Sequence, residues 1–216
     1  MLENLIMNKQ ICIVDYGIGN LLSIQRAIEK LGFQAVVTND ANFILNSTHI
    51  ILPGVGAFGK AMESIKKLKL DKILNECSKN NKFILGICLG MQLLCSRSEE
   101  FEINNGLNLI PGRVIPLKSI VDKRKIKIPN IGWLNIKKNI NGKTSKIDEN
   151  INQHESFYFI HSFTAVTDSK YQISSSYYCG VEFQAIINKG NIYGVQFHPE
   201  KSGESGLKLL NNFVNL

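Results

Sequence analysis

The stretch Phe83-Ile-Leu-Gly-Ile-Cys-Leu-Gly-Met-Gln92 joins an apolar strand pattern to an apolar helix pattern through a cysteine flanked by glycines. This order of strand, sharp turn and helix, with Cys88 at the apex, is that of a Gly-x-nucleophile-x-Gly elbow. Glycine suits positions 86 and 90 because a tight turn presses them against neighbouring backbone, where a Cβ atom would clash. The pattern therefore predicts that Sγ of Cys88 stands clear of a sheet.

The helix that follows the elbow gives Cys88 two further properties. Its amino end carries partial positive charge, which favours a thiolate. The backbone N–H of Leu89 is placed to face a developing oxyanion. The alternative is a structural cysteine in an ordinary strand-to-helix turn, since a free cysteine is commonly a small buried hydrophobe. The rest of the chain must decide between them.

Composition indicates an ordinary globular protein. The chain has 216 residues, of which 44% are hydrophobic and 20% charged. This length suits one domain, so we expect a single domain over residues 1–216, with residues 1–9 as a short extension and Met7 as an alternative start. No apolar stretch is long enough to span a bilayer, and the first residues lack a signal-peptide pattern. We expect a cytoplasmic protein without a membrane partner.

Cysteine usage and charge exclude several classes. The five cysteines are odd in number and form no Cys-x-x-Cys pair, so we expect no disulfide framework and no metal site. A reducing compartment fits this usage and a catalytic thiolate. The net charge is +7, but the basic residues are scattered. The densest run, Lys118 to Lys127, indicates a solvated loop, or a surface for a phosphorylated substrate or partner, more than a nucleic-acid site.

The first third of the chain predicts a parallel sheet. A β-branched strand at 11–14, a helical period over 21–31 and a second strand at 33–37 form a βαβ unit, which predicts helices on both faces of the sheet. Gly17 and Gly19 lack the third glycine of a dinucleotide-binding fingerprint, so we do not expect a nucleotide cofactor there.

A glycine-rich loop, Pro53-Gly-Val-Gly-Ala-Phe-Gly59, follows a third strand at 49–52. Open α/β sheets bind ligands in the crevice at the carboxyl ends of their strands. Exposed N–H groups near Val55 and Gly56 would form the second half of an oxyanion hole there. The alternative is a simple turn into the helical segments that we expect over 60–80.

The second half of the chain predicts antiparallel additions to this sheet. Residues 138–155 are polar and indicate a surface insertion. The single tryptophan, Trp133, is of the kind that anchors a core or an interface. Strands are expected at 134–137, 156–160, 171–181, 182–187 and 192–197. Together these patterns predict an α/β fold with a mostly parallel central sheet and antiparallel additions.

The last predicted strand ends in His198-Pro-Glu200. In extended backbone, residues two apart point to the same side, so we expect the imidazole and the carboxylate to be neighbours. A carboxylate can orient the imidazole while the imidazole transfers the proton of a cysteine nucleophile. The segment Ser202 to Gly206 is expected to cap a final helix.

The elbow and the His-x-Glu segment together resemble the class-I (triad) glutamine amidotransferases. Within that family the closer resemblance is to the glutaminase subunits of imidazole glycerol phosphate synthases, of histidine biosynthesis. It rests on Val14–Leu21, Leu52–Gly59 and Phe159–Ser162, and covers about residues 10–215. The resemblance implies a flavodoxin-like, class-I glutamine amidotransferase-like fold without a cofactor, and hydrolysis of L-glutamine to glutamate and ammonia.

Site residues follow from the same resemblance. The implied catalytic triad is Cys88, His198 and Glu200. The implied substrate-binding residues are Gly54, Val55, Gly56, Leu89, Gln92, Glu100 and Ser162, although Glu99-Glu100 alone would indicate only an exposed charge pair. The positions that match a partner interface are Asn20, Trp133, Tyr158 and Lys201. The implied partner is a (β/α)8-barrel cyclase that forms a heterodimer with this chain and receives ammonia through a channel.

The sequence departs from the family pattern at Asn130, Leu134 and Phe163, where His, Asn and Tyr are usual, and at Leu22, where Arg is frequent. These positions bear on the partner side and on loops near the glutamine. They leave open a paralogous subunit that supplies ammonia for amination of a nucleotide-linked or surface sugar. A cysteine hydrolase without a partner and a non-catalytic ligand-binding module are further alternatives.

Overall fold

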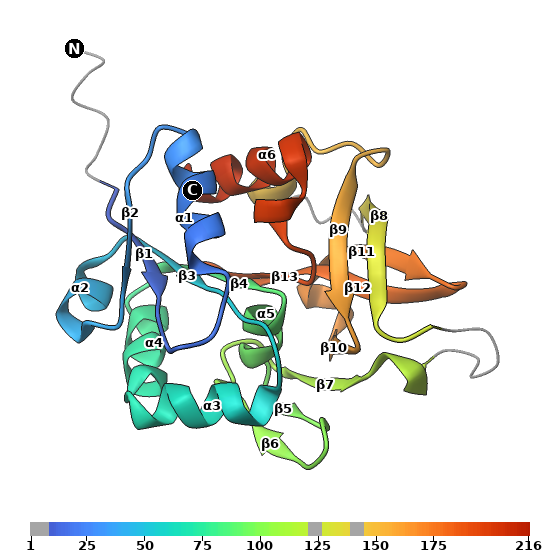
Figure 1. The fold of residues 1–216 in the computed structure, drawn as a ribbon, viewed down its shortest axis with the longest axis horizontal. Helices are drawn as coiled ribbons and strands as arrows, with labels where there is room; N and C mark the ends of the chain where they lie inside the picture. Colours follow the sequence, from blue (N-terminus) through green and yellow to red (C-terminus); the bar gives the residue numbers. More distant parts are fainter. Residues whose placement is uncertain (1–8, 121–126, 139–144) are drawn as a thin grey trace.

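The computed structural model describes residues 9–120, 127–138 and 145–216. These residues form a large mixed sheet with helices on both sides, beside a smaller sheet (Figure 1). The strands are β1 (Ile11–Val14), β2 (Ala35–Thr38), β3 (His49–Leu52), β4 (Phe83–Ile87), β5 (Arg97–Ser98), β6 (Asn104–Asn105), β7 (Gly112–Pro116), β8 (Asn130–Lys138), β9 (Ser156–His161), β10 (Phe163–Thr167), β11 (Gln172–Tyr178), β12 (Val181–Lys189) and β13 (Ile192–Val195). The α-helices are α1 (Leu21–Lys30), α2 (Ala41–Asn46), α3 (Phe58–Lys67), α4 (Leu70–Lys79), α5 (Leu89–Leu93) and α6 (Gly203–Val214). The short 3-10 helices are η2 (Leu117–Ser119), η3 (Lys146–Asp148), η4 (Ser169–Tyr171) and η5 (Pro199–Lys201).

The parallel half of the large sheet has the strand order β2-β1-β3-β4-β13, and each neighbouring pair in it is parallel. Numbered along the chain, this is the 2-1-3-4-5 order of doubly wound, flavodoxin-like sheets. The predicted fold class is confirmed. Its elbow strand β4 lies next to β13, so the segments that carry Cys88 and His198 leave the sheet side by side.

Alternating side chains of β1 show why helices cover both faces. Ile11 and Ile13 are buried in one apolar cluster with residues of α1 and α6. Cys12 and Val14 are buried in the other, with residues of α2, α3 and α4. Successive side chains of a strand point to opposite faces, so a strand that is apolar throughout must be covered twice. Figure 1 shows α1 and α6 on one side of the sheet, with α3 and α4 on the other.

The antiparallel additions extend the sheet through β12, β11, β8 and β9. The strand predicted at 134–137 is part of the longer β8, which pairs with β9 from Asn130 opposite His161 onwards. The prediction began too late because Gly132 and the alternation of exposed side chains weaken the apolar signal. Strand β10 was not expected. It pairs with β7 in the smaller sheet, whose order is β10-β7-β5-β6.

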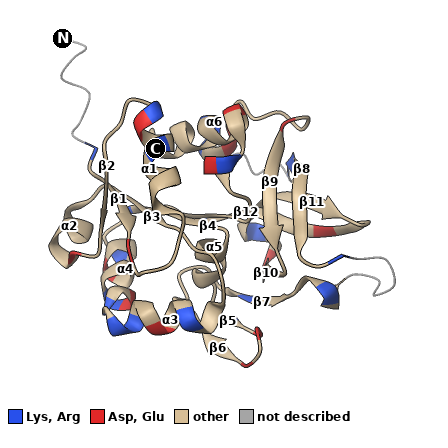
Figure 2. Cartoon of the chain, viewed as in Figure 1, with Lys and Arg blue, Asp and Glu red and all other residues tan. Residues whose placement is uncertain are grey.

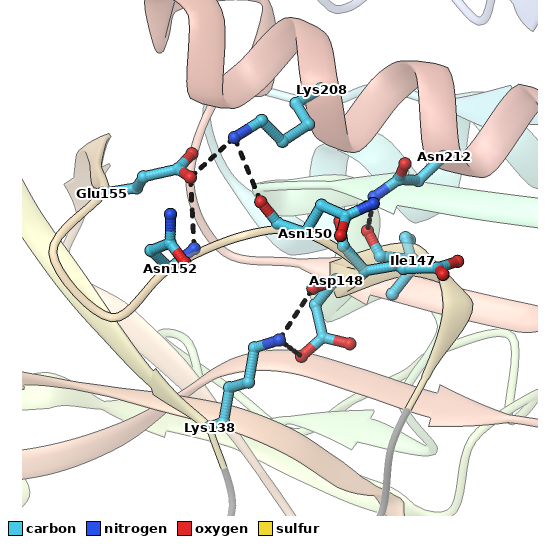
Figure 3. Close-up of polar contacts among 9 residues, drawn as sticks. Lys138, Ile147, Asp148, Asn150, Asn152, Glu155, Lys208 and Asn212 are labelled. Atoms are coloured by element: carbon cyan, nitrogen blue, oxygen red, sulfur yellow. Dashed lines mark hydrogen bonds and ion pairs between the residues drawn. The ribbon is translucent and has the colours of Figure 1, made fainter.

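The interpretation of residues 138–155 as a surface insertion needs a partial correction, because residue 138 ends β8 and the exposed segment 145–155 also has buried anchors; residues 139–144 lie outside the described residues. Ile147 and Ile151 are buried in the apolar cluster that contains α6. On α6, Asn212 donates to the carbonyls of Ile147 and Glu149, and Lys208 contacts Glu155 Oε1 at 2.7 Å (Figure 3). The exposed side chains of this segment are therefore polar, and its buried side chains and carbonyl groups attach it to α6.

The charges of the described residues are mixed in sign. Along α3 and α4, lysines alternate with acidic residues, and Figure 2 shows both signs on these helices. Most of the basic run from Lys118 to Lys127 lies outside the described residues. All five cysteines are free. Among the helices of the described residues, none has the length and apolarity needed to cross a membrane.

Candidate active site

The elbow has the strained geometry that its sequence predicts. Cys88 sits between β4 and α5 with φ 54° and ψ −109°, a conformation that residues other than glycine rarely adopt. A Cβ at Gly86 would lie 2.6 Å from the carbonyl of Gly90, and one at Gly90 would overlap the carbonyl oxygen of Leu52. The two glycines therefore let the turn close against β3.

The glycine-rich loop after β3 lies against this elbow. Gly54 is buried, and a Cβ there would lie 2.7 Å from Tyr16 Oη and 2.8 Å from Leu89 Cβ. Tyr16 Oη donates to the carbonyl of Pro53 at 2.6 Å, which fixes the start of the loop. Val55 and Gly56 are exposed and reach the pocket described below. The loop is thus held at Gly54 and open at its tip.

His198 and Glu200 are neighbours, as expected, but not for the expected reason. His198 is extended, whereas Glu200 lies in the 3-10 helix η5, so the two do not share the face of one strand. The turn nevertheless brings Glu200 Oε1 within 2.8 Å of His198 Nδ1, and both side chains are buried. Pro199 fits the first position of η5 because its fixed φ suits a helical turn and no N–H is needed there.

Main-chain bonds hold η5 in place. The N–H of His198 donates to the carbonyl of Tyr158 at 2.9 Å. Ser202 Oγ donates to the carbonyl of His198 and accepts from the N–H of Tyr158. As expected for the segment Ser202 to Gly206, Ser202 occupies the N-cap position of α6, but its hydroxyl joins β9 to η5 and makes no side-chain cap of the helix.

The pKa of His198 is raised to about 10. Burial by itself lowers the pKa of an imidazole, and here the interactions with the Cys88 sulfur and the Glu200 carboxylate outweigh it. His198 Nε2 is buried and forms no hydrogen bond to a described residue in this geometry. The imidazole therefore keeps its proton at neutral pH.

One pocket of about 280 Å³ gathers most of the predicted site. Predicted residues that line it are Val55, Gly56, Cys88, Leu89, Gln92, Glu100, Ser162 and His198. Gly54 and Glu200 do not line it and support the loop and the imidazole from behind. Its other lining residues are Pro129, Ile160, His161 and Phe163. Residues more than 100 positions apart thus meet at the carboxyl ends of β4 and β13.

Glu100 is not the exposed charge that the pair Glu99-Glu100 alone would indicate. It is buried, and its Oε2 accepts from the N–H of Phe58, the first residue of α3, at 2.6 Å. A carboxylate at a helix amino end is favourably placed. Glu100 therefore ties the pocket to the end of the glycine-rich loop and is not part of an exposed charge pair.

Sequence reasoning missed two polar residues at the site. His161 lines the pocket, and its pKa is lowered to about 4 by burial and by the nearby His198, so it is neutral at neutral pH. Gln196 is fully buried and its Nε2 lies 3.7 Å from Cys88 Sγ. A glutamine near the end of an otherwise apolar strand was the available signal for Gln196.

The four predicted interface positions are placed as follows. Trp133 on β8 is 55% exposed, and its ring meets that of Tyr158 on β9 edge to face at 5.9 Å. Lys201 is exposed at the end of η5, which packs against β9 and α1. Asn20 immediately precedes α1. Trp133, Tyr158 and Lys201 thus lie on the side of the molecule next to His198.

The described residues contain no group of three or more His, Cys, Asp or Glu side chains that could hold a metal ion. What the arrangement offers chemically is a sulfur at the apex of a strained turn, a protonated imidazole oriented by a carboxylate, and backbone N–H groups at the start of α5. These are the parts of a cysteine-dependent acyl transfer.

Comparisons with known proteins identify the family. The family Glutamine amidotransferase class-I matches residues 12–216. The imidazole glycerol phosphate synthase subunit HisH of Geobacillus sp. (strain WCH70) is 39% identical over 94% of this chain and 95% of its own. That of Chlorobium chlorochromatii (strain CaD3) is 44% identical over 94% of this chain and 98% of its own.

A solved structure shows the same fold at lower identity. The structure of PurLQS from Thermotoga maritima has a TM-score of 0.73 and 20% identity, covering 97% of this chain and 99% of that chain. The family match and the two relatives together establish membership: the chain belongs to the class-I glutamine amidotransferases, within the family of imidazole glycerol phosphate synthase HisH subunits.

Proposed function

We propose that this chain is the glutaminase subunit of an imidazole glycerol phosphate synthase and uses Cys88, His198 and Glu200 as its catalytic triad. The observation that carries the assignment is the shared pocket, in which the elbow sulfur and a carboxylate-bound imidazole face one space. The whole chain acts as one glutamine amidotransferase domain, without a cofactor, in the cytoplasm.

The reaction begins when the Cys88 thiolate attacks the carboxamide carbon of glutamine. The tetrahedral oxyanion is met by the N–H of Leu89 and by N–H groups of the loop Gly54 to Gly56, and one such donor is typically worth about 3–4 kcal/mol. His198 gives its proton to the departing ammonia, and a thioester to Cys88 remains. The then neutral imidazole takes a proton from water, which attacks the thioester; glutamate is released, and the Cys88 thiolate and the His198 imidazolium are restored.

Glu200 supports both proton transfers. Its carboxylate accepts from Nδ1 of His198, which leaves Nε2 to give and take the proton. Gln92, Glu100 and Ser162 line the same pocket as the nucleophile, and Gln92 and Glu100 hold the amino-acid end of glutamine.

The partner is a (β/α)8-barrel cyclase that forms a heterodimer with this chain through the side that carries Asn20, Trp133, Tyr158 and Lys201. Ammonia released into neutral water would be protonated and would lose its nucleophilicity, so it passes through a closed channel into the barrel. The open tip of the glycine-rich loop, Val55 and Gly56, takes its active shape in the complex, which suppresses wasteful hydrolysis.

Glutamate release in the complex tests the triad. Co-expressed with the barrel subunit from the same genome, the wild-type chain should form glutamate from glutamine, and Cys88→Ala should lower the rate by at least about 10³-fold. Cys179→Ala, at an exposed cysteine outside the site, is the matched control and should retain the wild-type rate. A Cys88→Ala complex that still forms glutamate would refute the assignment.

The acceptor is tested separately. The curated relatives described above carry the imidazole glycerol phosphate synthase name, which favours the histidine-pathway acceptor over a nucleotide-linked or surface sugar. The complex should convert the ribonucleotide precursor and glutamine to imidazole glycerol phosphate and AICAR, and the precursor should stimulate glutaminase activity. Stimulation by a sugar nucleotide alone would instead assign the paralogous function.

A further inference from the structure

The side chain of Gln196 has no role in the mechanism above, although it contacts the nucleophile. It is 0% exposed, and its Nε2 lies 3.7 Å from Cys88 Sγ, within hydrogen-bond range for the large sulfur atom. Burying an amide is costly unless its polar atoms are paired. The hydrogen bonds of the amide oxygen and the amide nitrogen of Gln196 therefore indicate its role.

A chain of hydrogen bonds fixes the orientation of the Gln196 amide. The carbonyl of Phe163 can only accept, so the atom of Gln92 that lies 3.1 Å from it must be the donor Nε2. The same Nε2 lies 3.0 Å from Gln196, which must therefore present its oxygen to Gln92. The Gln196 nitrogen therefore faces Cys88. The hydrogen-bond network fixes this orientation of the amide, in which the sulfur is next to a donor.

His161 strengthens the anchor of this chain. Its Nδ1 lies 2.8 Å from the same carbonyl of Phe163 and must donate to it, and its Nε2 then accepts from Asn130 Nδ2 at 2.9 Å. Two donors, from His161 and Gln92, thus hold one carbonyl at the start of β10. That carbonyl fixes the orientation of the Gln92 amide, which in turn orients the Gln196 amide next to Cys88.

Among the described side chains, Gln196 is the neutral donor hydrogen-bonded to Sγ. The carbonyl of Ile160 lies 3.7 Å away and can accept only from the thiol. Tyr16 is close enough for the charge of Cys88 to raise its pKa, but its hydroxyl donates to Pro53. The remaining charged neighbour is His198 with Glu200 behind it. Gln196 is therefore the neutral donor that faces the sulfur on its buried side.

We propose, resting on the glutaminase function proposed above, that Gln196 is a positioning residue for the nucleophile. Its Nε2–H group donates to the Cys88 sulfur from the buried side and stabilises it as the thiolate. Gln92 has a second role as the residue that orients Gln196, and the Phe163 carbonyl anchors both.

Two variants separate the donor from the rest of the side chain. Gln196→Glu has nearly the same shape and can still accept from Gln92, but when ionised it has no hydrogen to give to the sulfur. Gln196→Leu removes both functions. The matched control is Gln184→Glu, since Gln184 is also a buried glutamine that donates, on β12, but its partners are Thr167 and Gln172, outside the pocket.

The first readout is the pH dependence of Cys88 alkylation by iodoacetamide, resolved by peptide mass spectrometry because the exposed Cys179 also reacts. Relative to wild type, both Gln196 variants should need a pH about one unit higher for half-maximal alkylation of Cys88. A charge-assisted hydrogen bond of about 1.5–3 kcal/mol predicts a kcat for glutamate release in the complex that is lower by about 10–100-fold, with KM changed less than about threefold.

The control separates this role from a merely structural one. Gln184→Glu should lower the unfolding midpoint and leave the alkylation profile and kcat at wild-type values. Gln196 variants that are folded and alkylated as in wild type, or that change KM alone, would overturn the proposal while leaving the triad intact. A wild-type complex without glutaminase activity would instead refute the proposed function, since the alkylation profiles need no turnover.

Discussion

His198 is held in its protonated form by two neighbours, and the stability that this gives the fold is lost in alkaline solution. Its pKa is raised from 6.5 to about 10 against the effect of burial, because Cys88 and Glu200 favour the imidazolium. A group whose pKa is higher in the folded state binds its proton more tightly there, so it stabilises the fold at low pH. That contribution is complete below about pH 6.5 and is lost as the pH rises towards 10.

Replacing Glu200 by glutamine tests this linkage. Glu200→Gln should lower kcat by about 10²–10⁴-fold, as expected when the orienting carboxylate of a triad is removed. The variant should also be less stable than the wild type at pH 6.5. This difference in unfolding free energy should shrink as the pH rises from 6.5 to 10. Urea unfolding at several pH values measures it, with Glu29→Gln on the exposed side of α1 as the control. Parallel stability curves for the wild type and Glu200→Gln would contradict the assigned role of Glu200.

At the scale of elements, the elbow depends on how closely α5 approaches β3. Gly90 lies in the first turn of α5, and the space that its Cβ would need is occupied by the backbone carbonyl of Leu52. A backbone atom cannot rotate away as a side chain can. Because Leu52 leads directly into the glycine-rich loop, the same contact sets the distance between Cys88 and Gly54.

Gly90→Ala should therefore destabilise the protein by about 3 kcal/mol or more, since overpacking against backbone forces the elements apart. Glutaminase activity should fall even in the folded fraction, because the loop moves with Leu52. Denaturant unfolding measures the first effect and glutamate release the second. Gly190→Asn is the control: its φ of 59° suits asparagine and no atom lies within 4 Å of a Cβ there, so a change within about 1 kcal/mol is expected. Equal stabilities for the two variants would show that the elbow can relax.

At the scale of the whole molecule, the pocket and an aromatic surface lie on the same side. Tyr158 is bonded through its backbone to His198 and Ser202, and its ring packs on the exposed Trp133. A partner that covers Trp133 therefore also contacts the strand that supports the catalytic imidazole. Large aromatic side chains with exposed faces commonly carry much of the binding energy of an interface.

Trp133→Ala should weaken binding of the barrel subunit by about 2 kcal/mol, roughly thirtyfold in Kd. Stability of the isolated chain should change little, because more than half of the side chain is already exposed. Isothermal titration calorimetry provides the Kd. Leu68→Ala is the control, since Leu68 is 41% exposed at the end of α3 that is remote from the pocket, and it should bind as the wild type does. Wild-type affinity for Trp133→Ala would place the interface elsewhere.

Features that depend on neighbouring residues could be predicted from the sequence. The strand at His49–Leu52 and the elbow from Phe83 to Leu93 follow from apolar runs ended by glycines, and such signals act within one turn of chain. His198 and Glu200 are two residues apart, so they meet even though the backbone between them is a 3-10 turn and not a strand.

Contacts between residues far apart in the sequence could not be predicted before the chain was folded. The bond between Gln92 and Gln196 joins positions 104 apart, and Asn212 anchors a segment 65 residues away. Neither contact leaves a local period in the sequence, because each depends on sheet register and on which helix covers which face. Local signals fix which residues can act, whereas the burial and hydrogen bonding of distant side chains are fixed only when β4 and β13 pair and α6 closes over the sheet.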